Sequence, residues 1–222
     1  MKKLLGLLTV SVMALFASAD QHGYLQFAIW SPGELPTPEY RIDGLRLTLF
    51  YGQSRNFRGL DFCPVYGVTR TRGNFTGLGL NGVSVVEQSM TGWQFGFFSS
   101  YTAETMTGLQ TAVFYNGTDG KARGIQLAAL VNDAGTANGL QLGALANVAN
   151  TVNGLQLPAI YNGADEANGI QVGLWNNVND DMNGLQVGLV NVSSGLDGLQ
   201  LGLINVNFGG PIPFFPFLNV GW

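Results

Sequence analysis

Cysteine and histidine are almost absent from this chain of 222 residues, which contains one of each. Cys63 has no second cysteine for an intramolecular disulfide, and its setting in GLDFCPVYG predicts a small buried residue in a strand. The lone histidine, His22, is expected to be a solvated residue near the start of the mature chain. The sequence also lacks a GxSxG elbow, a CxxC pair and a histidine-containing metal motif. We therefore predict a protein that is not an enzyme and needs no cofactor.

Charged residues are also scarce, at 11% of the chain, and acidic residues outnumber basic ones by 14 to 10. This balance makes nucleic acid a poor partner. No basic residue follows Arg123. Such segregation could orient the protein against a charged surface, but it indicates scattered solvated charges more strongly.

Helical periodicity is missing after the first 19 residues, which read MKKLLGLLTVSVMALFASA. Lys2 and Lys3 precede an apolar run of about 14 residues, which ends in small residues suited to cleavage after Ala19. Such a run is shorter than the roughly 20 residues that span a bilayer. Residues 1–19 are therefore predicted to be a secretory signal peptide, and the mature protein is expected at the cell surface or outer membrane.

Glycine, in contrast, is abundant, with 32 residues, and eleven of the glycines open copies of a repeat of about 15 residues. Within a copy such as NGLQVGLVNV, apolar and polar or small residues alternate, which indicates a strand. Each copy ends in turn-forming residues. The sequence thus predicts an all-β chain with an N-terminal cap at 20–43, tandem repeats at 44–207 and a C-terminal cap at 208–222.

Two polar markers keep a constant phase in the repeat. Glutamine stands two residues after the opening glycine, and asparagine stands about seven residues before the next one. In some copies the strand has one residue more, and we expect Ala144 and its equivalents to round a corner there. The most regular markers are Gly139, Gln141, Asn147, Gly154, Gln156, Asn162, Gly169, Gln171, Asn177, Gly184, Gln186 and Asn191.

Two architectures agree with these strands, and in both we expect the leucine side of each strand to be buried. In a β-solenoid, parallel coils of about 15 residues would stack identical residues, so that amide side chains form ladders along the axis. The alternative is an antiparallel outer-membrane β-barrel. Antiparallel pairing gives no reason for identical residues at identical phase, and Pro158 would lie in mid-strand. The solenoid is favoured, with the proline- and aromatic-rich segment at 208–222 covering its last coil.

The tandem GLQ-φ-G-φ-φ-N units, in which φ is apolar, and the closing INVNFGGPIPFFPFLNVGW resemble the bacterial family of surface-repeat-containing proteins. The resemblance covers residues 23 to 222. It implies an exported, surface-associated repeat protein and little chemistry. The early copies depart from the pattern, because Arg46, Asp61 and Gly79 replace the glutamine.

Acidic and aromatic residues supply the candidate binding groups. Parallel stacking would bring four turn carboxylates together, which could hold Ca²⁺, although turn acids more often only face water. These weak candidates for a metal site are Asp165, Glu166, Asp180 and Asp181. An exposed aromatic row including Trp93 and Trp175 could bind sugars or protein, whereas Phe95 and Phe97 are expected in the core.

These features predict an exported, non-enzymatic surface repeat protein that acts as a structural or binding scaffold at the bacterial cell envelope. Its partner would be a protein or a glycan of the envelope or surface, with possible outer-membrane association. One alternative is an integral outer-membrane β-barrel protein. Another is a carbohydrate-binding or carbohydrate-active β-helix, whose site would have to lie in the early copies.

Overall fold

The computed structural model describes residues 22–30 and 33–222, so the predicted signal peptide at 1–19 lies outside it. The described residues form strands, bends and turns, and no helix occurs among them. Accordingly, none of residues 22–30 and 33–222 forms a helix that is long and apolar enough to cross a membrane. The chain divides into an N-terminal unit that ends at Ala103 and a C-terminal unit that begins at Glu104.

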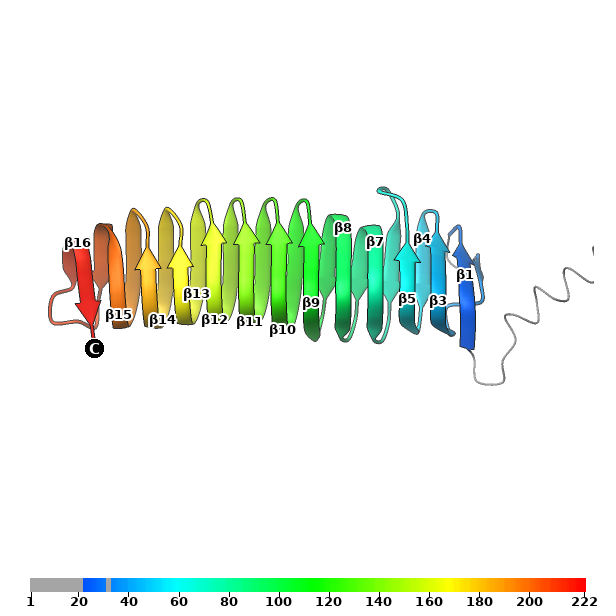
Figure 1. The fold of residues 1–222 in the computed structure, drawn as a ribbon, viewed down its shortest axis with the longest axis horizontal. Coiled ribbons are helices and arrows are strands. Elements are labelled where there is room, and N and C mark those ends of the chain that lie inside the picture. The colour runs from blue at the N-terminus through cyan, green and yellow to red at the C-terminus, as the bar shows by residue number, and fades with distance from the viewer. Residues whose placement is uncertain (1–21, 31–32) are drawn as a thin grey trace, which may run out of the picture. The chain divides into compact units, whose positions relative to one another are not determined.

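The C-terminal unit is a stack of coils in which most strands are 12 to 14 residues long and bend around a corner (Figure 1). Short bends separate one strand from the next. The strands are β9 (Thr105–Ala112), β10 (Tyr115–Ala128), β11 (Val131–Gly143), β12 (Ala146–Pro158), β13 (Tyr161–Val172), β14 (Trp175–Val187), β15 (Val190–Asn207) and β16 (Phe214–Gly221).

The N-terminal unit has the same coiled arrangement with shorter and less regular strands. Its first coils are split into separate strands, whereas its last two, like those of the C-terminal unit, are continuous. The strands are β1 (His22–Ala28), β2 (Glu34–Leu35), β3 (Arg41–Thr48), β4 (Tyr51–Ser54), β5 (Asn56–Phe62), β6 (Val68–Thr71), β7 (Phe75–Val86) and β8 (Met90–Thr102).

Strand pairing within each unit identifies the fold. Leu185 lies opposite Leu199 in a parallel pair, so each coil stacks on the equivalent residues of the one before it. The same holds in the N-terminal unit, where Gly77 lies opposite Gly92. The predicted all-β solenoid of coils of about 15 residues is therefore confirmed, and the antiparallel alternative is wrong.

Only the strands at the two ends pair in the antiparallel sense among the described residues. β2 pairs with β1, and β16 pairs with β15, with Val206 opposite Phe214. β16 also accepts a hydrogen bond from the buried side chain of Asn205 in β15, whose Nδ2 donates to the backbone oxygen of Phe215 at 3.1 Å. The antiparallel strand β16 thus provides hydrogen-bond partners for polar groups of the last coil.

The opening glycine of each copy forms a corner of the coil. All eleven have positive φ, between 119° and 156°. At Gly154 a Cβ would lie 2.1 Å from the carbonyl oxygen of Gly139 in the coil before. Because a side chain fits neither the φ nor the space, glycine is required here. A second change of direction lies between β11 and β12, where Ala144 sits in a bend, as predicted.

The interior of each coil is narrow, and one of its rows is apolar. This row is the residue two positions before each corner glycine, which is buried in every coil. It is large in the N-terminal unit, where Phe57 and Phe75 stack with ring centroids 5.2 Å apart. In the C-terminal unit it includes the smaller Ala122, Ala137 and Ala167. The remaining interior space is filled mainly by polar side chains.

Candidate binding surface

Seven glutamines form a continuous ladder inside the C-terminal unit. In each step the Nε2 of one glutamine donates to the Oε1 of the glutamine in the preceding coil, at 2.8 to 2.9 Å. Each of the seven is at most 2% exposed. Because the inner members both donate and accept, the buried amides satisfy one another. The glutamines are Gln110, Gln126, Gln141, Gln156, Gln171, Gln186 and Gln200.

Buried asparagines form a second ladder whose hydrogen bonds run in the opposite direction. Asn132 donates to Asn147 at 2.8 Å, and Asn176 donates to Asn191 at 2.7 Å. The ladder is broken once, since Asn147 donates instead to the backbone oxygen of Gln141 and leaves the Oδ1 of Asn162 without a partner. The predicted amide ladders are therefore present, and they occupy the core.

The sequence prediction placed the wrong asparagine in one step of this ladder. Asn176 is fully buried opposite Asn162, whereas Asn177 faces outward opposite Gly163. The pairing register shifts by one residue beyond Val178, within the turn of β14. The extra residue is therefore absorbed by the turn, and counting back from the next glycine selects the wrong position.

The leucine side of each strand faces outward and is partly or largely exposed, contrary to the expectation that it would be buried. Gln126 and Ala128 point inward, while Ile125 and Leu127 are 40% and 45% exposed. Alternation shows that a strand has two faces, but not which of them is inside. The glutamine side chains can be buried inside the narrow coil because each amide forms hydrogen bonds with the glutamines of the neighbouring coils. For the same reason Phe95, expected in the core with Phe97, is only half-buried, and it is Gln94 beside it that is fully buried.

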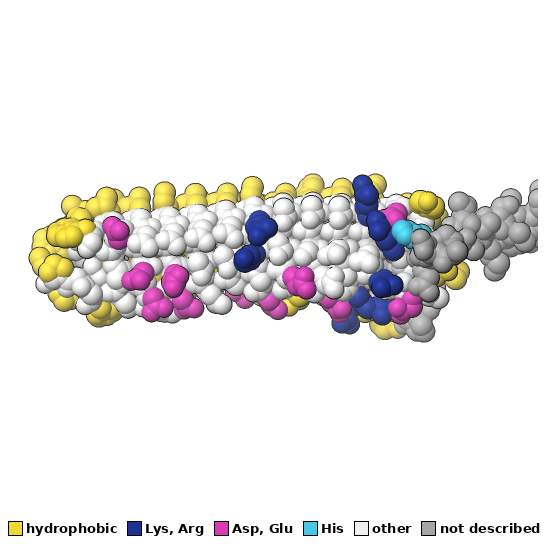
Figure 2. All heavy atoms as spheres, turned by 90° about the horizontal axis from the view of Figure 1, so that it is seen from below, with side chains coloured by type: hydrophobic (Ala, Val, Ile, Leu, Met, Phe, Trp, Pro, Cys, Tyr) yellow, Lys and Arg dark blue, Asp and Glu magenta, His cyan; other side chains and the backbone are white. Residues whose placement is uncertain are grey.

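We define the leucine face as the apolar, outward-facing side chains one and three residues after the corner glycines of the C-terminal unit. Figure 2 shows hydrophobic side chains in a row along one edge of this unit, whereas most of its acidic side chains lie toward the opposite edge. Further exposed leucines lie in the bends, including Leu145 and Leu189. The face consists of Leu109, Ile125, Leu127, Leu140, Leu142, Leu155, Leu157, Ile170, Val172, Leu185, Val187, Leu199 and Leu201.

The N-terminal unit departs from the glutamine ladder, as its sequence indicates. Arg46 lies opposite Asp61, and Asp61 lies opposite Gly79. The Nδ2 of Asn81 donates to Asp61 at 3.1 Å, and the Arg46 guanidinium stands 4.8 Å from the ring centre of Phe57. These groups are buried and bonded to one another, so they complete the interior of the coil.

Cys63 and His22 differ in how well sequence anticipated them. Cys63 is 3% exposed, which confirms the predicted burial. Burial, together with the negative charge of Asp61, raises the pKa of its thiol to about 11, against a smaller opposing effect of Arg46. His22 is not a free solvated residue, because its Nδ1 lies 3.0 Å from the Oδ2 of Asp43.

The four turn acids considered for Ca²⁺ do not form a ligand set. The Oδ1 of Asp165 accepts a hydrogen bond from Asn179 at 2.9 Å, and Glu166 lies opposite Thr151. In the part of the chain that the structure describes, no three His, Cys, Asp or Glu side chains are placed to hold a metal ion. Asp165, Glu166, Asp180 and Asp181 are instead exposed turn residues.

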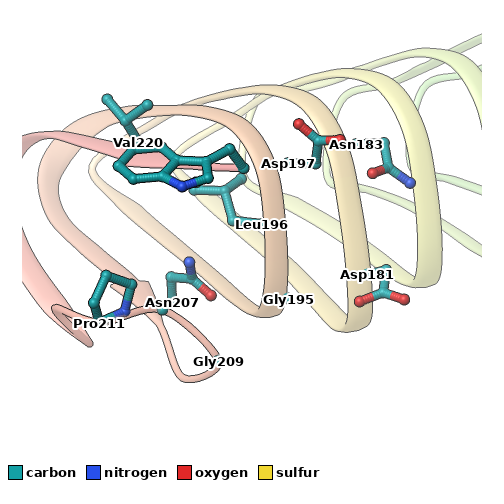
Figure 3. Close-up of a pocket in the computed structure, with 12 residues that line it drawn as sticks. Asp181, Asn183, Gly195, Leu196, Asp197, Asn207, Gly209, Pro211 and Val220 are labelled. Carbon is teal, nitrogen blue, oxygen red and sulfur yellow. The ribbon is translucent and has the colours of Figure 1, made fainter.

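A hollow of about 380 Å³ lies near the end of the C-terminal unit, between β14, β15 and the last residues (Figure 3). Asp181 and Asp197 line it from neighbouring strands, and Figure 3 shows them lying apart. Asn207 and Trp222 also line it. The two carboxylates do not converge on one point, so the hollow offers no paired acid and base.

Several aromatic residues considered for a binding face are exposed. Trp93 is 42% and Trp175 is 51% exposed, and Phe114 is 44% exposed. Phe98 is also exposed and meets Phe97 edge-on, with ring centroids 5.1 Å apart. These rings are confined to β8, the bend after β9 and β14, whereas the leucine face continues through every coil from β9 to β15.

The chain matches no protein-family model, no curated protein and no solved structure.

Proposed function

We propose that this protein is an exported, non-enzymatic scaffold of the bacterial cell envelope, which presents a repeated surface to a partner. The leucine face is the observation that carries the proposal. It repeats the same apolar side chains in successive coils, and several of them, such as Leu127 and Leu201, are about 40% exposed or more. Contiguous apolar surfaces of this extent mark interaction sites in soluble proteins.

The interior of the coils supports a structural role. Its glutamines and most of its asparagines are engaged in hydrogen bonds between coils. The buried ion pair of Arg46 and Asp61 is also hydrogen-bonded to Thr71 and Asn81. Polar groups bonded in this way stiffen a solenoid and stabilise it. The binding role accordingly falls to the outer faces.

Export is supported by residues 1–19, which have the composition of a signal peptide. Expression of the full chain in a Gram-negative host, followed by fractionation and N-terminal sequencing, tests it. We expect a product that begins at Asp20 and fractionates with the envelope. A variant without residues 2–19 is the matched control and should stay in the cytosol. An intact N-terminus on protein confined to the cytosol would contradict the proposal.

A further inference from the structure

The leucine face and the apolar bend residues that border it are together large enough to form a specific interface. Seven coils spaced by about 4.8 Å give it a length of about 34 Å. Its two rows and the row of apolar bend residues that borders them are spaced by about 6.6 Å along the strand, so the three rows together cover a width of about 20 Å. The resulting flat area of about 700 Å² per copy doubles to about 1,400 Å² in a pair, which is within the range of stable interfaces.

The face carries no charge. Within the C-terminal unit the charged side chains lie between a bend and the next corner glycine, and the nearest to the face are Arg123 and Asp197, which directly precede Gly124 and Gly198. Between each corner glycine and the following bend, the outward positions from β10 to β15 are all apolar. An uncharged centre with charges confined to its borders is the usual anatomy of a protein interface.

The spacing of the side chains selects the partner. Equivalent residues recur once per coil, as in the register of Leu140 with Leu155 and Ile170. A second surface can seat its side chains between these rows in every coil only if it has the same spacing. Another copy of this face has that spacing, and interdigitated rows of identical side chains form dry, closely packed interfaces.

We propose that the leucine face of the C-terminal unit binds the leucine face of a second copy of this chain. The pairing is isologous, with the same patch contributed by both copies. The two faces pack with their sheets about 10 Å apart. This inference deepens the proposed scaffold function and rests on it, in that it names the partner of the repeated surface.

The measurement is the molar mass of the purified chain by light scattering during size-exclusion chromatography. We expect twice the chain mass for the wild type. Leu127→Glu and Ile170→Glu each place a charge in the centre of the face, and we expect each to raise the dissociation constant at least about tenfold. Both side chains are already 40 to 45% exposed, so the coil itself should tolerate the change.

Val148→Glu is the matched control. Val148 is 37% exposed and lies in β12 before the corner Gly154, on the other side of the coil. It should leave the dimer intact, and circular dichroism should show that all variants are folded. If a glutamate variant does not fold, Leu127→Thr, whose β-branched side chain suits a strand, should still weaken the dimer.

A wild-type chain that stays monomeric at about 100 µM overturns the inference. Dimers that persist in both glutamate variants overturn it as well, as does equal disruption by Val148→Glu. A monomer that floats with phosphatidylcholine vesicles and loses this property in Leu127→Glu would assign the face to lipid instead. If the chain dimerises but is not exported, the proposed envelope function is wrong and the pairing of leucine faces still holds.

Discussion

Arg46 and Asp61 form a buried ion pair at the position where the C-terminal unit places glutamine against glutamine. The Nη2 and Nε of Arg46 donate to the Oδ2 and Oδ1 of Asp61 at 2.6 and 2.7 Å. Their side chains are 1% and 0% exposed. Strand register therefore places a charged pair where later coils have a neutral amide step, because a guanidinium and a carboxylate also satisfy each other across one coil spacing.

Breaking this pair should be costly. Asp61→Asn leaves the Arg46 cation buried without its counter-ion, and we expect a loss of about 3 to 5 kcal/mol in the free energy of unfolding. Replacing both residues by glutamine restores a neutral step and should cost less than the single change. Urea unfolding followed by circular dichroism measures both. A double variant that is less stable than Asp61→Asn would contradict this account of the pair.

The glutamine ladder should be sensitive to a single apolar substitution. Gln156 donates to Gln141 and accepts from Gln171, both at 2.8 Å. Gln156→Leu would leave one acceptor and one donor unsatisfied, at about 1 to 3 kcal/mol for each. Asn153→Leu is the control, since Asn153 belongs to an exposed asparagine row. An equal loss of unfolding free energy in the two variants would show that the buried ladder stabilises the fold no more than the exposed asparagine row does.

A corner glycine should not tolerate a side chain. Gly154 has φ of +151°, and a Cβ there would collide with the carbonyl oxygen of Gly139. Gly154→Ala should therefore lower the melting temperature strongly. At Gly173 the nearest atom would be 3.2 Å from a Cβ, so Gly173→Ala should be much milder. The two melting curves, recorded under identical conditions, decide the point, and a reversed order would refute it.

The buried thiol should make stability depend on alkaline pH. Burial raises the pKa of Cys63 from 9.0 to about 11 in the folded chain. Its contribution is complete below pH 9, where the thiol is protonated in both states. Between about pH 9 and 11 only the unfolded chain loses the proton, so stability falls.

Cys63→Ala removes this titration and serves as the reference. The difference in unfolding free energy between wild type and variant should shrink as pH rises through that window. A constant difference from pH 8 to pH 11 would contradict the raised pKa of Cys63. Folded wild-type protein should also resist thiol reagents at neutral pH, because the thiol is 3% exposed.

Much of the fold could be predicted because the repeat carries its own register. Gln141 and Gln156 stand at the same phase, and parallel pairing is the arrangement that makes such identity useful. The turns were less predictable. Asn176 replaces Asn177 in the ladder because a one-residue shift in the turn of β14 leaves no mark in the glycine spacing.

The candidate surface could be predicted only in part. The sequence leaves open whether Trp93 and Trp175 are exposed or buried, and both are exposed. It predicts buried leucines, whereas the leucines face outward. The sequence did contain a signal: in the last eight copies glutamine is constant two residues after the corner, while the residue before it changes among Leu, Ile and Trp. Strict identity marks a position where side chains bond to their own copies, and variation marks one that faces outward.

The sequence by itself determined that the chain is all-β, that its coils repeat every 15 residues or so, and that equivalent residues stack. The length of the repeat and the positions of Gly, Gln and Asn within it can be read directly from the sequence. Only the tertiary structure decided which side of the strand is inside. Gln156 is buried and Leu127 is exposed because amides in a narrow coil can bond to the coils above and below, a gain that exists only once the coils are stacked.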